Sequence, residues 1–246
     1  MTDRDDIFQN QPTEVASFRF DDAVARVFPD MIKRSVPGYA ETVAMCGVIA
    51  GRYATDNSNL YDLGCSLGAV TLAMRHGVKA SGCKVIGVDN SESMLERASH
   101  YIAIDDQSLA GNPVPVDLWC DDITELELEK ASVVALNYVL QFIPVPERLA
   151  LLSKISSGML PGGALILSEK IVFDSPEQEL QAELHWDFKR ANGYSEMEIA
   201  RKRTAIEDYL VPETEAVHKQ RLLDAGFSKV IRWHQCFNFA SFLAIK

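Results

Sequence analysis

The stretch LYDLGCSLGAVTLAM, residues 60–74, combines residue types and a spacing that could bind a small ligand. An apolar run ends at Asp62, Gly64 and Gly68 follow, and an apolar pattern with helical spacing begins. Gly64 allows the chain to leave a strand with a positive φ angle, and Gly68 allows the next helix to pack closely. The first N–H groups of that helix would be free to bind an anion. Because the spacing differs from the dinucleotide-binding pattern G-x-G-x-x-G, we expect a different ligand.

Three polar residues end later apolar runs in a similar manner. Asp89 ends VIGVD, Asp122 ends VDLWCDD and Asn137 ends ASVVALN. The carboxyl ends of parallel strands meet at one edge of a sheet, where a carboxylate such as Asp89 can accept hydrogen bonds from ribose hydroxyls. Simpler interpretations exist, since Asp89 could cap a helix, Asp122 could lie in a solvated turn and Asp62 could bond local amides. The position of these residues at the ends of successive strands favours a nucleoside site.

A parallel sheet is needed to bring these residues together. From residue 59 to residue 170, short apolar runs alternate with helical patterns, which indicates a parallel sheet covered on both faces. The final strands are close enough in sequence to pair as an antiparallel hairpin. We therefore predict an α/β fold with strands at 59–64, 83–89, 116–122, 131–137, 162–170, 227–236 and 239–246, and intervening helices at 68–77, 91–103 and 146–160.

The remaining segments are interpreted as additions to this sheet within a single domain, 1–246. Residues 1–17 are largely polar and are expected to be mobile. Residues 18–55 have helical spacing and form an N-terminal helical lid in this interpretation. Residues 175–220 are polar and charged, with helical character, and are expected to form a helical insertion.

Local signals subdivide the N-terminal helical segment. Asp21 and Asp22 precede its first apolar residues and could cap a helix. Pro29 and Pro37-Gly38 are expected to break the segment into pieces, because proline lacks the backbone donor that a helix needs.

Composition narrows the possible functions. The formal net charge is −11, from 24 basic and 35 acidic residues, whereas proteins that bind nucleic acid usually carry a positive surface. The five cysteines and five histidines are dispersed, so no metal site is expected. No apolar run approaches the roughly 18 residues that span a membrane, and the N-terminus has no signal-peptide or transit-peptide pattern. These features favour a cytoplasmic protein with a small-molecule substrate and no direct contact with nucleic acid or membrane.

The glycine loop resembles the D/E-x-G-x-G-x-G loop of the S-adenosylmethionine-dependent methyltransferases, with Ser66 replacing the middle glycine. A serine fits such a loop because this ligand has no pyrophosphate. Longer segments resemble one family within this class, the carboxy-S-adenosyl-L-methionine synthases. They are FPDMIKRSVPGYAETV, YDLGCSLGA, LNYVLQFI, PGGALILSEK, DFKRANGYSEMEIARKR and WHQCFNFASFLAIK. The resemblance extends from about Phe18 to Lys246. It implies a Rossmann-like methyltransferase fold with a mostly parallel seven-stranded sheet, a C-terminal antiparallel hairpin and a helical insertion.

The resemblance also implies an enzyme, a transferase. Members of that family convert S-adenosyl-L-methionine and prephenate to carboxy-S-adenosyl-L-methionine and phenylpyruvate. The sulfonium acidifies its own methyl group, which can then capture the carbon dioxide that prephenate releases as it becomes aromatic. The product is the carboxymethyl donor for modification of the tRNA wobble uridine, so the acidic chain itself need not bind nucleic acid. A homodimer is expected, with the insertion as the contact element.

Site residues follow from the same resemblance. Arg203, in ARKR, would bind the new carboxylate in its own or a neighbouring subunit, because arginine offers a fixed charge and a bidentate fork. Without the resemblance, 201–203 would be an ordinary solvated helical face and Tyr39 a packing residue. The residues expected to bind the ligand are Tyr39, Gly64, Cys65, Ser66, Asp89, Asn90, Asp122, Ile123 and Asn137.

Other functions stay open at this point. The main alternative is an S-adenosylmethionine-dependent methyltransferase of small molecules, although NYVLQF stands where N-methyltransferases have N/D-P-P-Y/F, and the Pro-Cys dipeptide of the pyrimidine C5 enzymes is absent. A non-catalytic nucleoside-binding or scaffold protein would share the fold. A nicotinamide dehydrogenase is least favoured, because of the loop spacing and the closing hairpin.

Overall fold

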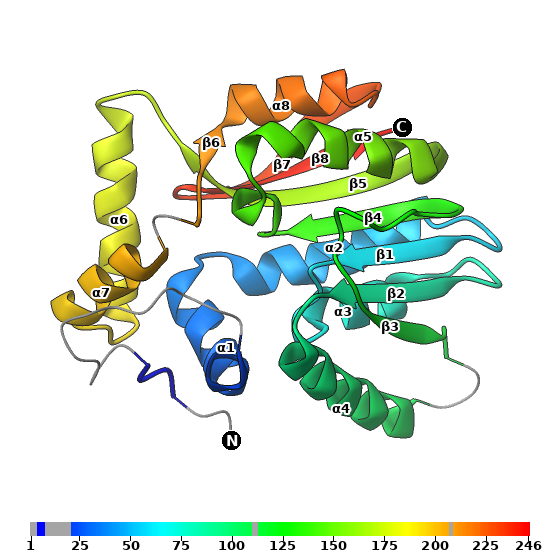
Figure 1. Cartoon of the computed structure of the whole chain (residues 1–246), viewed down its shortest axis with the longest axis horizontal. Coiled ribbons are helices and arrows are strands. Elements are labelled where there is room, and N and C mark those ends of the chain that lie inside the picture. Colours follow the sequence, from blue (N-terminus) through cyan, green and yellow to red (C-terminus); the bar gives the residue numbers. More distant parts are fainter. Residues whose placement is uncertain (1–3, 8–20, 110–112, 207–208) are drawn as a thin grey trace.

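A single mixed sheet forms the centre of the computed structural model, which describes residues 4–7, 21–109, 113–206 and 209–246 (Figure 1). Along the sheet the strand order is β3-β2-β1-β4-β5-β8-β7, and a short strand, β6, pairs with β5. The first five strands are parallel, whereas β8 runs antiparallel to both β5 and β7. The predicted seven-stranded sheet and its terminal hairpin are confirmed, and β6 is an addition. The strands are β1 Asn59–Leu63, β2 Lys84–Asp89, β3 Val116–Cys120, β4 Ala131–Asn137, β5 Met159–Val172, β6 Glu213–Thr214, β7 Lys229–Cys236 and β8 Phe239–Ile245.

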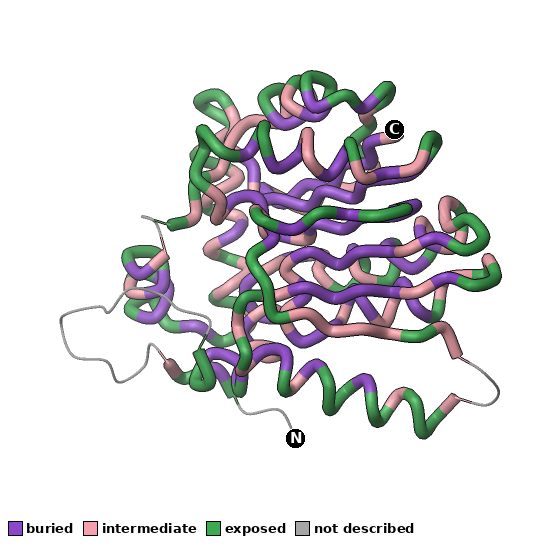
Figure 2. The backbone as a smooth tube through the Cα atoms, turned by 45° about the vertical axis from the view of Figure 1, so that its right-hand side comes forward, coloured by how far each residue is buried: buried purple, intermediate pink, exposed green. Residues whose placement is uncertain are grey.

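Helices cover both faces of the sheet. Successive residues of β4 alternate between two apolar cores, with Val134 and Leu136 in one and Val133 and Ala135 in the other. This alternation explains why the sequence of β4 is continuously apolar. The central strands are buried along most of their length (Figure 2). The helices are α1 Asp22–Ser35, α2 Tyr39–Tyr53, α3 Ala69–Gly77, α4 Glu92–Ser108, α5 Arg148–Gly158, α6 Glu177–Ala191, α7 Glu196–Ile206 and α8 Glu215–Asp224.

The two layers contain different helices. Helices α2 and α3 pack on the face that carries Val133, whereas α5 and α8 pack on the face that carries Val134. Helix α1 contacts α4, α6 and α2. Figure 1 shows α1, α6 and α7 beyond the end of the sheet toward which β4 points. No helix within the described ranges is long and apolar enough to cross a membrane.

The N-terminal helices confirm one predicted break and contradict another. Helix α1 ends at Ser35 and α2 begins after Gly38, which has a φ of +76°. Pro29, however, lies inside α1, so the expected break there is wrong. The helix continues because its apolar side, including Val27 and Met31, is buried in a core shared with Met94 of α4. That packing outweighs the backbone hydrogen bond that Pro29 cannot make.

Side chains cap two helix starts, and the cap at Asp21 is one that the sequence predicted. The Asp21 side chain accepts a hydrogen bond from the Val24 N–H at 3.1 Å, and the Ser91 hydroxyl accepts one from the Met94 N–H at 3.3 Å. The division of the chain into a domain with a lid at 18–55 and an insertion at 175–220 stays an interpretation, and residues 18–20 lie outside the described ranges.

Candidate functional site

A cavity of about 530 Å³ opens at the carboxyl ends of β1, β2 and β4, and residues of α1, α6 and α7 form its other walls. This volume lies within the usual range for small-molecule sites, roughly 300–1,000 Å³. The structure places all ten predicted site residues on the wall of this cavity, although their individual roles stay predictions. They are Tyr39, Gly64, Cys65, Ser66, Asp89, Asn90, Asp122, Ile123, Asn137 and Arg203.

The glycine loop has the geometry that its sequence suggested. Gly64 has a φ of +76°, and a Cβ atom there would lie 2.5 Å from the Val139 side chain. Ser66 has a φ of +51°, which is uncommon for a residue with a side chain. Its N–H donates to the Asp89 carboxylate at 2.8 Å, which helps to hold this conformation. The Ser66 hydroxyl lies 3.5 Å from the Met94 sulfur.

Asp89 links the loop to the next helix. One carboxylate oxygen accepts from the Ser66 N–H at 2.8 Å and the other from the Ser91 N–H at 2.9 Å. Burial raises the pKa of Asp89, and these backbone donors partly offset that effect. Since a carboxylate offers about four lone-pair sites, further acceptor capacity is left for a ligand. The helix cap itself is Ser91, so capping does not account for Asp89.

Asp62 is buried behind the loop, with an exposed fraction of 1%. The Thr71 hydroxyl of α3 donates to its carboxylate at 2.6 Å. Burial raises the pKa of Asp62 to about 7, and the hydrogen bond from Thr71 opposes this rise. The Asp62–Thr71 hydrogen bond therefore joins the end of β1 to α3. Near neutral pH, burial favours the protonated form of the Asp62 side chain.

The ends of β3 and β4 differ in how far their polar atoms are satisfied. The Asp122 carboxylate accepts from both the N–H and the hydroxyl of Thr124 at 2.8 Å and is exposed. The Asn137 side-chain oxygen is buried and has no hydrogen-bond partner among the described residues. Buried polar atoms are nearly always paired, so this oxygen is a candidate ligand acceptor.

Cations form another part of the wall, and sequence reasoning found only Arg203 among them. Lys170 lies in β5, while Lys189 and Lys202 lie on α6 and α7. Burial and neighbouring cations lower the pKa of Lys189 to about 7. Lys170 could have been found, because it is the last residue of the predicted strand 162–170. Lys189 and Lys202 have no comparable signal.

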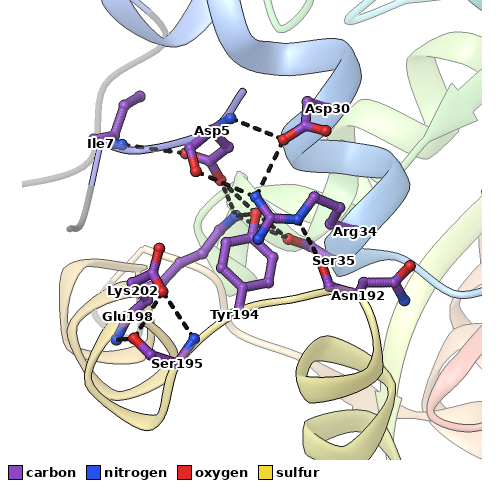
Figure 3. Close-up of polar contacts among 10 residues, drawn as sticks. All are labelled: Asp5, Ile7, Asp30, Arg34, Ser35, Asn192, Tyr194, Ser195, Glu198 and Lys202. Carbon is purple, nitrogen blue, oxygen red and sulfur yellow. Dashed lines mark hydrogen bonds and ion pairs between the residues drawn. The ribbon is translucent and has the colours of Figure 1, made fainter. Parts of the chain in front are cut away.

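A buried polar cluster holds Lys202 in place (Figure 3). Its ammonium lies 2.8 Å from the Ser35 hydroxyl, 3.3 Å from the Asp5 carboxylate and 3.3 Å from the Tyr194 hydroxyl. Burial lowers the pKa of Lys202 to about 8, and Asp5 opposes this shift. Asp5, in the N-terminal segment, has an exposed fraction of 1%, and the mobility of residues 1–17 stays a prediction. The rest of 1–17, apart from 4–7, lies outside the described ranges.

The cluster joins three segments that are distant in sequence. Arg34 of α1 donates to the Asn192 carbonyl at 2.7 Å and to the Asp5 carbonyl at 3.2 Å, and its guanidinium lies 3.9 Å from the centre of the Tyr194 ring. The N-terminal segment, α1 and the insertion are thereby fixed to one another beside the cavity. Across the described ranges, no group of three or more His, Cys, Asp or Glu side chains is arranged to hold a metal ion.

Comparisons with known proteins agree with this geometry. The family described as "Methyltransferase domain" matches residues 60–163. The crystal structure of human N-acetylserotonin methyltransferase in complex with SAM superimposes with a TM-score of 0.61 at 17% identity. The match covers 92% of this chain and 55% of that one, so the chain spans about half the length of the human enzyme. The chain thus has the fold of the class I S-adenosylmethionine-dependent methyltransferases.

Sequence relatives define the family within this class. A carboxy-S-adenosyl-L-methionine synthase from Marinobacter nauticus is 56% identical over 100% of this chain and 96% of its own length. One from Trichlorobacter lovleyi is 55% identical over the full length of both chains. The chain belongs to the carboxy-S-adenosyl-L-methionine synthase family.

Proposed function

We propose that this protein converts S-adenosyl-L-methionine and prephenate to carboxy-S-adenosyl-L-methionine and phenylpyruvate. The bond between the prephenate ring and its carboxyl carbon breaks, and that carbon bonds to the methyl carbon of S-adenosylmethionine. The hydroxyl group leaves the ring with the electrons of its C–O bond and takes up the proton lost by the methyl group, which gives water. The names of the full-length relatives support this reaction.

The single observation that carries the proposal is the convergence of the ten residues on one cavity. The residues fit an adenosyl sulfonium compound. Gly64 lets the loop turn at the end of β1, because a Cβ atom there would clash with the Val139 side chain, and Asp89 keeps acceptor capacity for ribose hydroxyls. The unpaired Asn137 oxygen offers an acceptor to the methionine part. The carboxylate-rich wall also suits a cationic sulfonium.

Arg203 is the proposed partner of the new carboxylate. Its guanidinium carbon lies 5.9 Å from the centre of the Trp186 ring, and the side chain lines the cavity of its own chain. In a homodimer, which the proposal includes, Arg203 binds the carboxylate in the cavity of its own subunit or in that of the neighbouring subunit. The proposal also places the protein in the cytoplasm and makes its product the carboxymethyl donor for the tRNA wobble uridine. The net charge of −11 supports a chain that does not itself bind tRNA.

Two measurements on purified protein test this function. Wild-type protein incubated with S-adenosylmethionine and prephenate should release phenylpyruvate only when both are present. Mass spectrometry of the same mixture should detect S-adenosylmethionine heavier by one carboxyl group. Release of S-adenosylhomocysteine without phenylpyruvate would instead support an ordinary small-molecule methyltransferase.

A further inference from the structure

The charges around the cavity are divided between its two sides. Within the described ranges, four of the five carboxylates on its wall lie at the ends of β1, β2 and β3, and the fifth, Glu147, immediately precedes α5, whereas the cations come from β5, α6 and α7. In the sheet, β5 and β2 lie on opposite sides of the β1–β4 pair, so the two groups of charge face different parts of a bound ligand. The strand-end carboxylates are Asp62, Asp89, Asp121 and Asp122, and the cations are Lys170, Lys189, Lys202 and Arg203.

Two of these cations have no counter-charge among the residues that the structure describes. Lys202 is bonded to Asp5 within the buried cluster, and Arg203 stacks near Trp186. The side-chain ammonium groups of Lys170 and Lys189, by contrast, have no hydrogen-bond or ion-pair partner in the part of the chain that the structure describes. The charged neighbours that perturb Lys189 are Lys202, Lys170 and Arg203, and all of them are cations. Holding partly buried cations together without an anion is unfavourable, so this arrangement is suited to an anionic ligand.

Aromatic rings lie beside the two lysines and make this side of the cavity apolar as well as cationic. Lys170 is paired across the sheet with Phe239, whose ring meets Tyr138 edge-on at 5.8 Å and His185 at 5.0 Å. The His185 Nε2–H donates to the Ser35 carbonyl at 2.8 Å, and burial lowers the pKa of His185 to about 3, so this ring is neutral. All of these side chains line the cavity.

We propose that Lys170 and Lys189 form the subsite for prephenate, with two ammonium groups matching its two carboxylates and the aromatic side chains contacting its ring. The inference rests on the proposed function for the identity of the dianion, whereas the unpaired lysines and the rings come from the structure. It also separates the roles of the cations, because one of the two lysines binds the transferred carboxylate before transfer and Arg203 binds it after transfer. The product phenylpyruvate retains one carboxylate, so it matches the subsite less well and can leave.

Methionine substitution of each lysine tests the subsite. Lys170→Met and Lys189→Met remove the charge but keep most of the apolar volume, so they should fold at least as well as the wild type. Each should raise the KM for prephenate by roughly tenfold or more at saturating S-adenosylmethionine. The Kd for S-adenosylmethionine, from calorimetry, should change less than about threefold. Lys189→Arg, which keeps the charge, should retain most of the prephenate affinity that Lys189→Met loses.

Reciprocal and surface controls make the test specific. Asp89→Asn should weaken S-adenosylmethionine and leave direct prephenate binding nearly unchanged. Lys84→Met, at an exposed pair with Asp117, should change neither ligand. An unchanged KM for prephenate in both lysine variants would overturn the subsite. So would an equal loss of S-adenosylmethionine binding, which would assign the lysines to its methionine carboxylate.

Direct titration separates this inference from the proposed function. If the wild type binds prephenate but releases no phenylpyruvate, the proposed reaction fails. In that case, loss of prephenate binding in the lysine variants would still support the subsite, and unchanged binding would reject it. Phenylpyruvate should bind more weakly than prephenate to the wild type, and the two affinities should differ less in the lysine variants. If they differ as much in the variants as in the wild type, this also counts against the subsite.

Discussion

The two sides of the cavity are built in different ways. On the carboxylate side, Asp89 is held by backbone donors 23 and two positions away in sequence, from Ser66 and Ser91. On the cationic side, Lys202 is held by Asp5 and Ser35, which are 197 and 167 positions away. Local strand-end turns therefore form the part of the site expected to bind the adenosyl group. Contacts between distant segments form the part expected to determine which second substrate is used.

The sides also share a property. Burial raises the pKa of Asp62 to about 7 on the carboxylate side and lowers that of Lys189 to about 7 on the cationic side. Each side therefore disfavours its own charges while no ligand compensates them. A ligand pair with a sulfonium and several carboxylates would relieve both effects, so we expect binding to fix the protonation states of both sides.

The largest expected effect comes from breaking the long-range support of the cationic side. Lys202→Met would leave the Asp5 carboxylate buried without its cation. Removing one partner of a buried ion pair typically lowers stability by about 3–5 kcal/mol. We expect the free energy of unfolding, measured with urea, to fall by about 3 kcal/mol. Prephenate affinity should also fall, because α7 and α1 are no longer joined at Ser35.

A double-variant cycle shows whether the loss belongs to the pair. Asp5→Asn combined with Lys202→Met should recover part of the stability, since neither variant then leaves a buried charge alone. Additive losses in the double variant would mean that Lys202 and Asp5 act independently and that the cluster does not support the cavity wall. Lys219→Met, at a partly exposed i,i+4 pair with Glu215, is the matched control and should change stability by less than about 0.5 kcal/mol.

The same difference explains what the sequence could predict. Strand ends such as Asp89 and Asn137 could be located because period, glycine positions and turn chemistry are local signals. Lys189 could not, because nothing near it in sequence indicates that α6 turns this side chain toward the strand ends. Pro29 was wrongly taken as a helix break, since its neighbours are buried against α4. The burial of Asp5 likewise depends on the distant insertion.

A smaller effect tests the carboxylate side through pH. Asp62 has a folded-state pKa of about 7 and an ordinary value of 3.8, so the folded protein binds the extra proton between these values. Stability from this group is complete below pH 3.8 and is lost as pH rises toward 7. The slope is at most about 1.4 kcal/mol per pH unit. Asp62→Asn keeps an acceptor for Thr71 and should remove this slope.

Urea unfolding of wild type and Asp62→Asn at pH 5, 6, 7 and 8 measures the difference. The curve of the wild type should fall relative to that of the variant up to about pH 7 and then run parallel to it. Glu169, whose pKa burial raises to about 8, contributes a slope of the same sign in both proteins and therefore cancels in the comparison. If the two curves stay parallel from pH 5, burial does not set the protonation of Asp62.

The smallest effect concerns Arg203. The product contains both the adenosyl group, expected on the carboxylate side of the cavity, and the transferred carboxylate, expected at Arg203 on the cationic side. Its side chain is exposed and stacks near Trp186, so its ion pair with the transferred carboxylate should contribute about 1 kcal/mol or less. Arg203→Ala should therefore weaken carboxy-S-adenosylmethionine by about fivefold in calorimetry and leave S-adenosylmethionine nearly unchanged. Arg203→Lys should give an intermediate loss, because it keeps the charge without the bidentate fork. Equal losses for both ligands would show that Arg203 shapes the cavity as a whole. The transferred carboxylate would then have to be bound by Lys170 or Lys189, and the separation between cations that act before and after transfer would fail.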